Sequence, residues 1–277
     1  MKLRALLLSA ITVLVLLTKA TAATYSLGPV ADARVIHGSG FDTGNYSTEI
    51  LSVYTSSSGI INTQRTFIRF DLSSIPLPLN AHVDSAILTL TASTAFGTNS
   101  SKPMEVYRVL SPWTETGLTW LNRDATHAWT NAGGDFAGTN GQPYAVSTSS
   151  PTNSQAVTWD VTTLVREWLT NSATNFGLLL KSADGNQLTF PSRETGTATT
   201  RPNLTVIISQ SQIQASSSAG QVTLRWTGSG VLQEKTNLNP AIAWGDSGRS
   251  VTPLNGTNTV NIPGPSGNNF FRLRGGP

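Results

Sequence analysis

The 277-residue sequence contains no cysteine, and this absence excludes two common ways of stabilising a domain. Neither disulfide bonds nor cysteine-ligated zinc sites can form, so stability has to come from a buried core. Histidine is also rare, and the three that occur, His37, His82 and His127, lie far apart in the sequence. None has a second histidine at the spacing of a metal site, so each is expected to be an ordinary surface or loop residue.

Long apolar runs are missing as well, apart from one near the beginning of the chain. The run Ala5–Leu17 is too short to span a bilayer comfortably, and two basic residues precede it. Lys19 directly follows the run, and Ala20–Ala22 has the small-x-small form that signal peptidase cuts. Residues 1–22 are therefore predicted to be a secretory signal peptide rather than an uncleaved anchor. The mature protein is expected to be extracellular or at the cell surface, with no membrane span.

Charged residues make up only 12% of the chain, and their balance argues against a nucleic-acid partner. Residues 1–22 carry three basic residues and no acid, so the remainder of the chain is neutral. Nucleic-acid binding normally requires a basic face. The charges divide unevenly, since residues 23–211 have a net charge of −3 and residues 212–277 have one of +3. This permits the two parts to dock, or the basic part to touch an acidic cell surface.

Short β-branched runs separated by glycine, proline and asparagine predict an all-β fold. Strands are expected at Ala33–His37, Ile50–Tyr54, Thr66–Leu72, Ser85–Ala92, Glu105–Leu110, Ala156–Val161, Gly177–Ser182, Gln187–Phe190 and Asn203–Ile208. In Asp160–Thr170 the apolar residues recur at helical spacing instead. A short helix capped by Asp160 is expected there, with Trp168 packed across one end of a sandwich.

The chain is predicted to form two domains. Residues 209–220 are polar and low in complexity, as linkers usually are. Residues 23–208 precede this linker as a large domain, and residues 221–277 follow it as a small β module. Within the large domain, residues 122–151 form a long glycine-rich loop, and such loops are often functional.

The segment Arg65–Ser73, RTFIRFDLS, is the most informative stretch of the sequence. In a strand its side chains alternate between two faces. One face carries only apolar side chains suited to a core, namely Ile68, Phe70 and Leu72. The other face carries an aromatic ring, a cation and an anion, namely Phe67, Arg69 and Asp71. Such a row indicates either a binding surface or an internal ion pair that fixes the strand.

A series of segments occurs in the order found in one known family. These are ADARV at 31–35, GNYS at 44–47, RTFIRFDLSSIP at 65–76, VDSAILTLTA at 83–92, VYRVLSPWTETGLTW at 106–120, WDVTTLVREW at 159–168, and FGLLLKS to NLTV at 176–206. Residues 23–208 thereby resemble the DNRLRE-type, disaggregatase-related domain of secreted microbial proteins, grouped as carbohydrate-binding module family 96. The string behind the family name is absent, and only Arg193 and Glu194 have an evident counterpart in it.

The resemblance implies a jelly-roll β-sandwich that binds polysaccharide, with acidic glycans such as alginate as the best-known ligand type, and it implies no catalysis. The terminal unit resembles small β modules at the ends of secreted proteins, which share an LxW strand and a final FFRLR. That second resemblance implies no function.

A site for uronic acid polymers needs cations, ideally arginine, and benefits from an aromatic platform. The candidate ligand-binding residues are Arg69, Lys181, Arg193, Arg108, Tyr107 and Trp129. The four cations would line one face if the strands that carry them are neighbours. The alternative is that they form ion pairs, Arg69 with Asp71 or Glu194, and Arg193 with Glu194 or another buried acid. Among the other tryptophans, Trp120, Trp159 and Trp168 are expected in the core.

No cofactor is expected. A structural calcium would need hard oxygen ligands, and Asp32, the turn Asp42–Asn45 and Asp71 are candidates. No EF-hand-like spacing supports such a site, and capped turns and ion pairs explain these acids better.

Catalysis has no local signature in the sequence. The carboxylates of Glu115, Glu167 and Glu194 lie in no recognisable glycosidase pattern, and a G-x-S-x-G turn is absent. The sequence therefore predicts a secreted, non-catalytic protein that binds an anionic polysaccharide. Two alternatives stay open: a structural protein of the cell surface or extracellular matrix that uses the same domain for assembly, and a polysaccharide lyase or hydrolase.

Overall fold

A computed structural model describes most of the chain, and its contacts divide it into two compact units. The described residues are 22–48, 50–55, 62–77, 81–96, 103–149, 152–182, 187–228, 230–264 and 268–274. The predicted signal peptide lies outside them, apart from its last residue. The first unit comprises residues 23–76 and 83–208, and the second comprises residues 209–276 with 77–82. Across the described ranges, no helix has the length and hydropathy that a membrane span requires.

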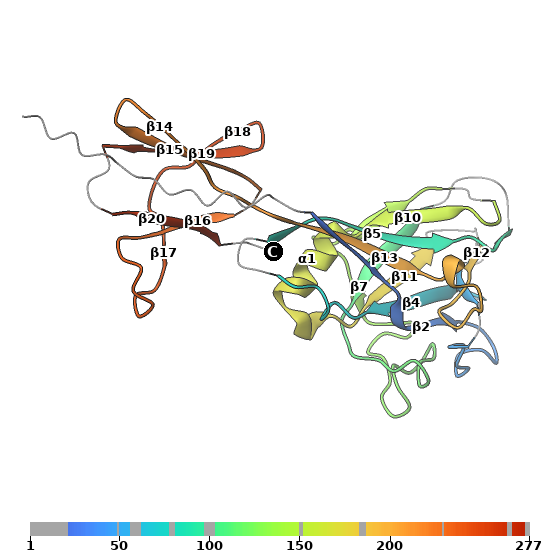
Figure 1. Cartoon of the computed structure of the whole chain (residues 1–277). Coiled ribbons are helices and arrows are strands. Elements are labelled where there is room, and N and C mark those ends of the chain that lie inside the picture. The colour runs from blue at the N-terminus through green and yellow to red at the C-terminus, as the bar shows by residue number, and fades with distance from the viewer. Residues whose placement is uncertain are drawn as a thin grey trace, which may run out of the picture. The chain divides into compact units, whose positions relative to one another are not determined.

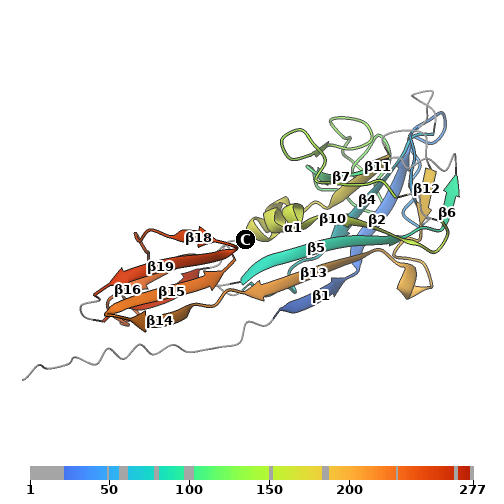
Figure 2. The same cartoon turned by 90° about the horizontal axis from the view of Figure 1, so that it is seen from above.

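The first unit is an all-β sandwich with one α-helix, as the sequence predicts (Figures 1 and 2). One antiparallel sheet consists, in spatial order, of β1 (Ala23–Leu27), β13 (Asn203–Gln210), β5 (Ala81–Thr91) and β10 (Ala156–Asp160). The other consists of β2 (Pro29–Ile36), β4 (Gln64–Phe70), β11 (Leu178–Ser182), β7 (Met104–Val109) and β8 (Phe136–Ala137), and β9 (Ala145–Ser147) also pairs with β7. A short third sheet consists of β3 (Leu51–Val53), β12 (Gln187–Phe190) and β6 (Thr94–Phe96). All nine expected strands are present, although most of their ends differ by a few residues.

The predicted core residues of the central strand are buried. Ile68 and Phe70 are fully covered and Leu72 nearly so. Trp159 of β10 is also buried, and its indole Nε1 donates a hydrogen bond to the backbone O of Met104 on β7 at 2.9 Å. Because these strands belong to different sheets, the bond joins the two layers and satisfies a polar atom that the core would otherwise leave unpaired.

The helix α1 (Thr162–Thr170) lies at one end of the sandwich (Figure 2). Leu164, Val165 and Trp168 are buried, which confirms the face expected from their spacing. The expected cap differs by one position, because the helix begins at Thr162 and its N-cap residue is Val161, which has no side-chain acceptor. Asp160 lies just outside and accepts a hydrogen bond from the backbone N of Thr162 at 3.0 Å.

The loop of residues 110–135 covers the face of β4 that carries Phe67 and Arg69. The sequence alone did not decide whether this face is covered or exposed. Figure 1 shows this loop, in green, beyond β2 and β4. Phe67 is fully buried, with its ring centroid 5.7 Å from that of Trp113 and 5.4 Å from that of Trp129. The loop and the sheet thus build a second core, formed by Ala31, Ala33, Val35, Phe67, Val109, Trp113, Leu118, Trp120, Trp129 and Leu179. Phe67 is therefore a packing residue and has no surface for a ligand.

Two glycines allow the loop to approach the sheet. Gly133 and Gly134 have φ values of +85° and +116°, where residues with a Cβ are strained. A Cβ on Gly134 would lie 2.7 Å from Cζ of Phe67, and one on Gly133 would lie 2.7 Å from the ring of Trp120. Only glycine fits between the loop backbone and these rings.

The second unit consists of two sheets around a core of its own. One contains β14 (Gln214–Ser218), β15 (Gln221–Thr227), β19 (Thr257–Pro263) and β18 (Thr252–Leu254). The other contains β17 (Gly245–Asp246), β16 (Val231–Lys235) and β20 (Phe270–Arg274). The buried residues of this unit are Val222, Leu224, Trp226, Leu232, Val260, Ile262 and Leu273. The expected linker at 209–220 is corrected in part, because β14 lies within it and pairs with β15.

We expect the substitution Gly134→Ala to destabilise the first unit by about 1–3 kcal/mol, because the new methyl group overlaps Phe67 and the backbone is strained. The measurement is urea unfolding followed by tryptophan fluorescence. Gly196→Ala is the matched control, since its Cβ would meet nothing within 4 Å at an ordinary φ. Equal effects of the two substitutions would contradict the packing described for the loop.

Candidate functional site

The strand register brings several candidate residues to one face of the larger sheet. Phe67 of β4 lies opposite Ala33 of β2 and Leu179 of β11, and Leu179 lies opposite Tyr107 of β7. Directly opposed residues in antiparallel strands project from the same face. By alternation along each strand, the cations Arg65, Arg69 and Lys181 and the acid Glu105 project from this face as well. Arg69 and Lys181 are thus brought together on one face, as the sequence analysis expected.

Lys181 lies among an acid and two aromatic rings. Its Nζ is 3.0 Å from Oε2 of Glu105, 5.0 Å from the ring centroid of Tyr107 and 6.0 Å from that of Phe136. The hydroxyl of Tyr107 donates to the same Oε2 at 3.0 Å. Burial, followed by the hydrogen bond to Glu105 and the charge of that carboxylate, raises the pKa of Tyr107 to about 12. With 28% of its side chain exposed, Lys181 remains accessible to a ligand.

Arg65 is a second cation at this place, and the sequence analysis missed it. Its Cζ lies 4.7 Å from the ring centroid of Trp120 and 5.2 Å from that of Phe136, while Nη1 donates to the backbone O of Gly133 at 2.8 Å. Within the described ranges no carboxylate pairs with Arg65, and its buried Nε has no hydrogen-bond partner. Burial lowers the pKa of the guanidinium to about 10. Its position in the sequence could have identified it, because Arg65 lies two residues before Phe67 and four before Arg69 and therefore projects from the same face of the strand.

Arg69 is held by a tryptophan rather than by an acid. Its Cζ lies 5.4 Å from the ring centroid of Trp113, and its Nη1 donates to the backbone O of that residue at 3.3 Å. Asp71, one of the expected partners, instead accepts hydrogen bonds from the backbone N and Oγ of Ser73, both at 2.9 Å. Those bonds lower the pKa of Asp71. The alternative in which Arg69 pairs with Asp71 is therefore wrong for this structure.

We call Arg65, Tyr107, Trp120, Phe136 and Lys181, with the acid Glu105, the basic–aromatic cluster. The rings of Tyr107 and Phe136 meet edge to face, with centroids 5.0 Å apart, and both cations contact Phe136. The cluster holds two cations and one acid, so it keeps a positive charge inside a domain that is acidic overall.

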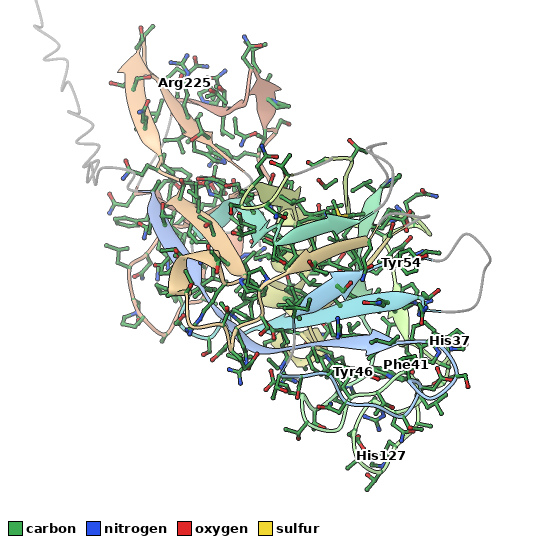
Figure 3. All side chains as sticks on the ribbon, turned by 90° about the vertical axis from the view of Figure 1, so that its right-hand side faces the viewer. His37, Phe41, Tyr46, Tyr54, His127 and Arg225 are labelled. Carbon is green, nitrogen blue, oxygen red and sulfur yellow. The ribbon has the colours of Figure 1, made fainter. Side chains whose placement is uncertain are left out.

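His37 lies at the loop end of the domain and adds a further ring beside the basic–aromatic cluster (Figure 3). Its imidazole stacks on Trp120, with ring centroids 4.8 Å apart, and its Nδ1 lies 2.8 Å from Oδ1 of Asp42. That contact and the backbone N–H of Gly38 lower the pKa of Asp42, although partial burial opposes them. His37 thus serves to hold the loop against Trp120, and the Asp42 carboxylate is occupied by these partners.

Arg108 lies on the opposite face of the sheet from Lys181 and belongs to a different group. It lies opposite Leu178, and its Nη1 is 2.9 Å from Oε2 of Glu167 on α1. The hydroxyl of Tyr144 donates to the same oxygen at 2.6 Å. The expectation that all four candidate cations line one face is therefore wrong for Arg108, which fastens the helix to the sheet.

Arg193 also lies away from the cluster, inside a group of acids. Its Nε and Nη2 donate to the two carboxylate oxygens of Glu115 at 2.9 and 3.0 Å, and its Nε is 2.8 Å from Oε1 of Glu194. Its backbone N donates to Oδ2 of the fully buried Asp32 at 2.8 Å. The bidentate contact with Glu115 raises the pKa of the guanidinium. The ion-pair alternative considered for Arg193 is the arrangement that the structure shows.

Trp129 was expected to contact ligand from the long loop, and this expectation is wrong. Only 5% of the residue is exposed, its ring stacks on Phe67, and its Nε1 donates to the backbone O of Thr119 at 3.2 Å. A ring covered in this way has no free face for a sugar. Trp120, Trp159 and Trp168 are buried as predicted.

Asp32, Glu115 and Glu194 place carboxylate oxygens within 4.8 Å of one another, which is a spacing that suits a cation. The guanidinium of Arg193 already lies among these acids and neutralises part of their charge. Burial is the main cause that raises the pKa of Asp32 to about 7, although the hydrogen bond from Arg193 opposes the shift. A proton on Asp32 is thus one way in which the group reduces its negative charge. Of the other calcium candidates, Asp42 and Asp71 hold hydrogen bonds to their own loops.

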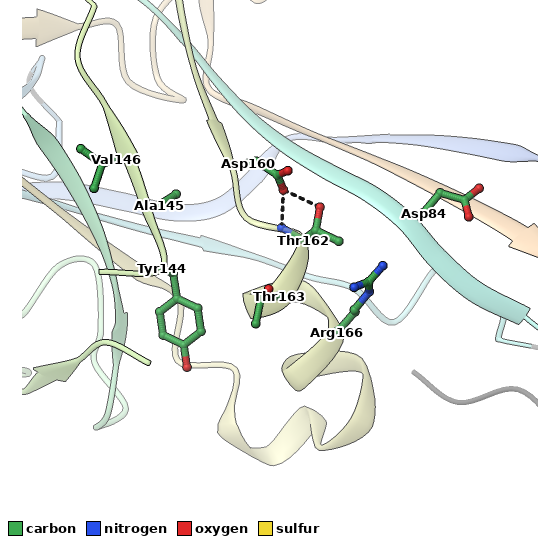
Figure 4. Close-up of a pocket in the computed structure, with 8 residues that line it drawn as sticks. All are labelled: Asp84, Tyr144, Ala145, Val146, Asp160, Thr162, Thr163 and Arg166. Atoms are coloured by element: carbon green, nitrogen blue, oxygen red, sulfur yellow. Dashed lines mark hydrogen bonds between the residues drawn. The ribbon is translucent and has the colours of Figure 1, made fainter. Parts of the chain in front are cut away.

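A separate polar hollow of about 560 Å³ lies beside the N-terminal end of α1 (Figure 4). Its lining residues are Asp84, Tyr144, Ala145, Val146, Asp160, Thr162, Thr163 and Arg166. None of the predicted site residues lines it. The guanidinium of Arg166 is already bonded to the backbone O of Val83, with Nη2 at 2.6 Å.

A comparison with family models decides the identity of the larger unit. Residues 23–208, about two thirds of the chain, match the model of carbohydrate-binding module family 96. The chain belongs to carbohydrate-binding module family 96. The family assignment expected from the ordered sequence segments is thereby confirmed, and residues 23–208 form a carbohydrate-binding module. A search of curated proteins gave no match to the chain.

In this family 96 module, Asp32 should make stability depend on pH. The pKa of the buried carboxyl is about 7, against an ordinary value of 3.8 for aspartate, so between these values the folded state binds one more proton than the unfolded state. Stability from this group is therefore lost as the pH rises from about 4 to 7. We expect Asp32→Asn, whose side-chain oxygen still accepts from Arg193, to flatten that part of the profile.

The measurement is the free energy of unfolding in urea at several pH values, for the unaltered protein and for the Asp32→Asn variant. The other acids are common to the two chains, so the difference between the profiles isolates Asp32. Parallel profiles across this pH range would show that Asp32 does not titrate as described.

Proposed function

We propose that the protein is secreted and that its family 96 module binds an acidic polysaccharide, such as a uronic acid polymer, without acting on it as an enzyme. The observation that carries the proposal is the basic–aromatic cluster, in which Lys181 and Arg65 converge on the ring of Phe136. Secretion is supported by the sequence of residues 1–22, and a mature chain that begins at Ala23 would be its direct evidence.

The chemistry of the cluster suits a sugar that carries a carboxylate. A cation held by aromatic rings and by no acid keeps its charge available for an anion, as Arg65 does, whereas Lys181 shares its charge with Glu105 at 3.0 Å. Arg65 has ring and carbonyl contacts only, and a guanidinium matches a carboxylate with two parallel hydrogen bonds. The half-buried rings of Tyr107 and Phe136 add apolar surface for the face of a sugar.

The partners of the candidate catalytic acids support the absence of catalysis. Glu115 and Glu194 contact the guanidinium of Arg193, and Glu167 contacts that of Arg108. A glycosidase needs two carboxylates that are free to reach a glycosidic bond, whereas each of these three is held by a guanidinium group. These carboxylates therefore suit ion pairs that hold loops and the helix in place.

One observation favours the structural alternative, in which the domain serves assembly at the cell surface. Arg108, Arg193 and Lys181 all contact carboxylates, so three of the four cations that were predicted to bind ligand also brace the fold. If bracing were their whole role, replacing them would lower stability and leave any affinity for glycan unchanged.

We expect Lys181→Met to weaken binding to alginate by about tenfold, because a charge-assisted hydrogen bond to a carboxylate is lost while the apolar stem still packs on Tyr107 and Phe136. Glu105→Gln should have the opposite effect and strengthen binding, because it releases Lys181 from its acid. The measurement is affinity electrophoresis in gels containing alginate, pectin or a neutral glucan.

Arg201→Gln serves as the control, because Arg201 is exposed and its guanidinium contacts only the backbone O of Thr195 among the described residues. It should leave retardation unchanged, and melting temperatures should be recorded for all variants. Retardation by none of the acidic polymers would refute the proposed ligand class. Release of reducing ends or unsaturated products from any polymer would refute the absence of catalysis.

A further inference from the structure

The second unit exposes an apolar loop that its own fold leaves uncovered. The loop joins β16 to β17 and spans residues 236–244, TNLNPAIAW. Leu238 is 58% exposed and Ile242 is 45% exposed, and Pro240 between them is also exposed. Two large aliphatic side chains in solvent at one loop tip cost free energy, so they indicate a surface that is covered in use.

Hydrogen bonds give this loop a defined shape. The side-chain oxygen of Asn237 accepts from the backbone N of Asn239 at 2.7 Å, and the backbone N of Ile242 donates to the backbone O of Asn239 at 3.1 Å. Nζ of Lys235 donates to the backbone O of Asn239 at 3.2 Å and to that of Ile242 at 3.3 Å. Leu238 and Ile242 are thus held outward on a turn whose backbone is fixed by Lys235.

Cations without acidic partners lie beside the loop. Cζ of Arg272 is 4.6 Å and Nζ of Lys235 is 5.0 Å from the ring centroid of Trp244, the last residue of the loop. In the described part of this unit neither cation contacts a carboxylate, and Arg272 donates from Nε to Oε1 of Gln233. The acids of residues 212–277 are occupied elsewhere, Glu234 with Arg249 and Asp246 with Arg274. The excess positive charge of the unit therefore lies partly at this loop.

We propose that this loop, with Lys235 and Arg272, docks the second unit on an anionic lipid surface. Leu238 and Ile242 enter the boundary between headgroups and acyl chains, Trp244 lies at headgroup level, and the two cations face lipid phosphates. Apolar side chains, an interfacial tryptophan and flanking cations are the features by which peripheral proteins bind membranes. This inference concerns a different unit from the glycan site and does not depend on the proposed function.

Two other occupants fit the observations less well. A glycan needs an open aromatic face, whereas the ring of Trp244 already has two cations against it, and a polyanionic sugar gives Leu238 and Ile242 no role. A stable protein interface buries about 800 Å² on each side, far more than one nine-residue loop supplies. Shallow insertion into a lipid interface requires no larger surface.

The test is cosedimentation of residues 23–277 with vesicles, because the apolar run of residues 5–17 would bind lipid on its own. Vesicles of phosphatidylcholine with about one third phosphatidylglycerol should bind the protein, pure phosphatidylcholine should bind it much less, and added salt should weaken the binding. Replacing Leu238 and Ile242 together by Ser should lower the partition coefficient at least about tenfold. Lys235→Gln should lower it about fivefold.

Matched controls lie in the same unit. Leu254→Ser removes an aliphatic side chain that is 69% exposed on β18, and Arg225→Gln removes an exposed cation on β15 (Figure 3). Both should bind vesicles like the unaltered protein. The proposal is overturned if both vesicle types bind the protein equally, if neither binds it, or if the loop variants match the controls. Retardation by alginate that Lys235→Gln abolishes, without vesicle binding, would assign the loop to a glycan and also overturn it.

Discussion

The packing of the loop at residues 110–135 against the outer face of β4 is the contact on which the rest of the site depends. It buries Phe67 between Trp113, Trp129 and Leu179, and it needs glycine at positions 133 and 134 to come close enough. The same contact brings a backbone oxygen and an indole ring to Arg65. Without the loop, Arg65 would lose the ring of Trp120 and Arg69 would lose that of Trp113, and these rings help to hold the two guanidinium groups in place.

The partners of the arginines separate those that brace the module from those that remain available. Arg193 and Arg108 are paired with carboxylates, and these pairs hold the loop of Glu115 and the helix of Glu167. Arg65 and Arg69 lie against tryptophan rings and carbonyl oxygens instead. A cation that has no acidic partner can still attract an external anion, and this is the physical reason for placing the proposed ligand at the basic–aromatic cluster, which contains Arg65.

The sequence predicts those features that depend on local pattern. Alternation in β4 correctly identifies Ile68 and Phe70 as core, helical spacing identifies Leu164, Val165 and Trp168, and ordered segments identify the family. Arg65 and the burial of Trp129 could not be predicted, because they depend on a loop that returns to β4 across more than 40 residues of sequence. The register between β7 and β11 places Arg108 on the opposite face from Lys181, and the pattern within either strand alone does not contain that information.

The central claim is that the module binds acidic glycans through cations held by aromatic rings. Calorimetric titration of residues 23–277 with uronic acid oligomers, and with neutral oligosaccharides of the same length, tests it most directly. The account predicts saturable binding of the acidic oligomers that weakens as salt is added, and little heat with the neutral ones. Absence of binding at low salt, or equal affinity for both kinds of oligomer, would contradict it.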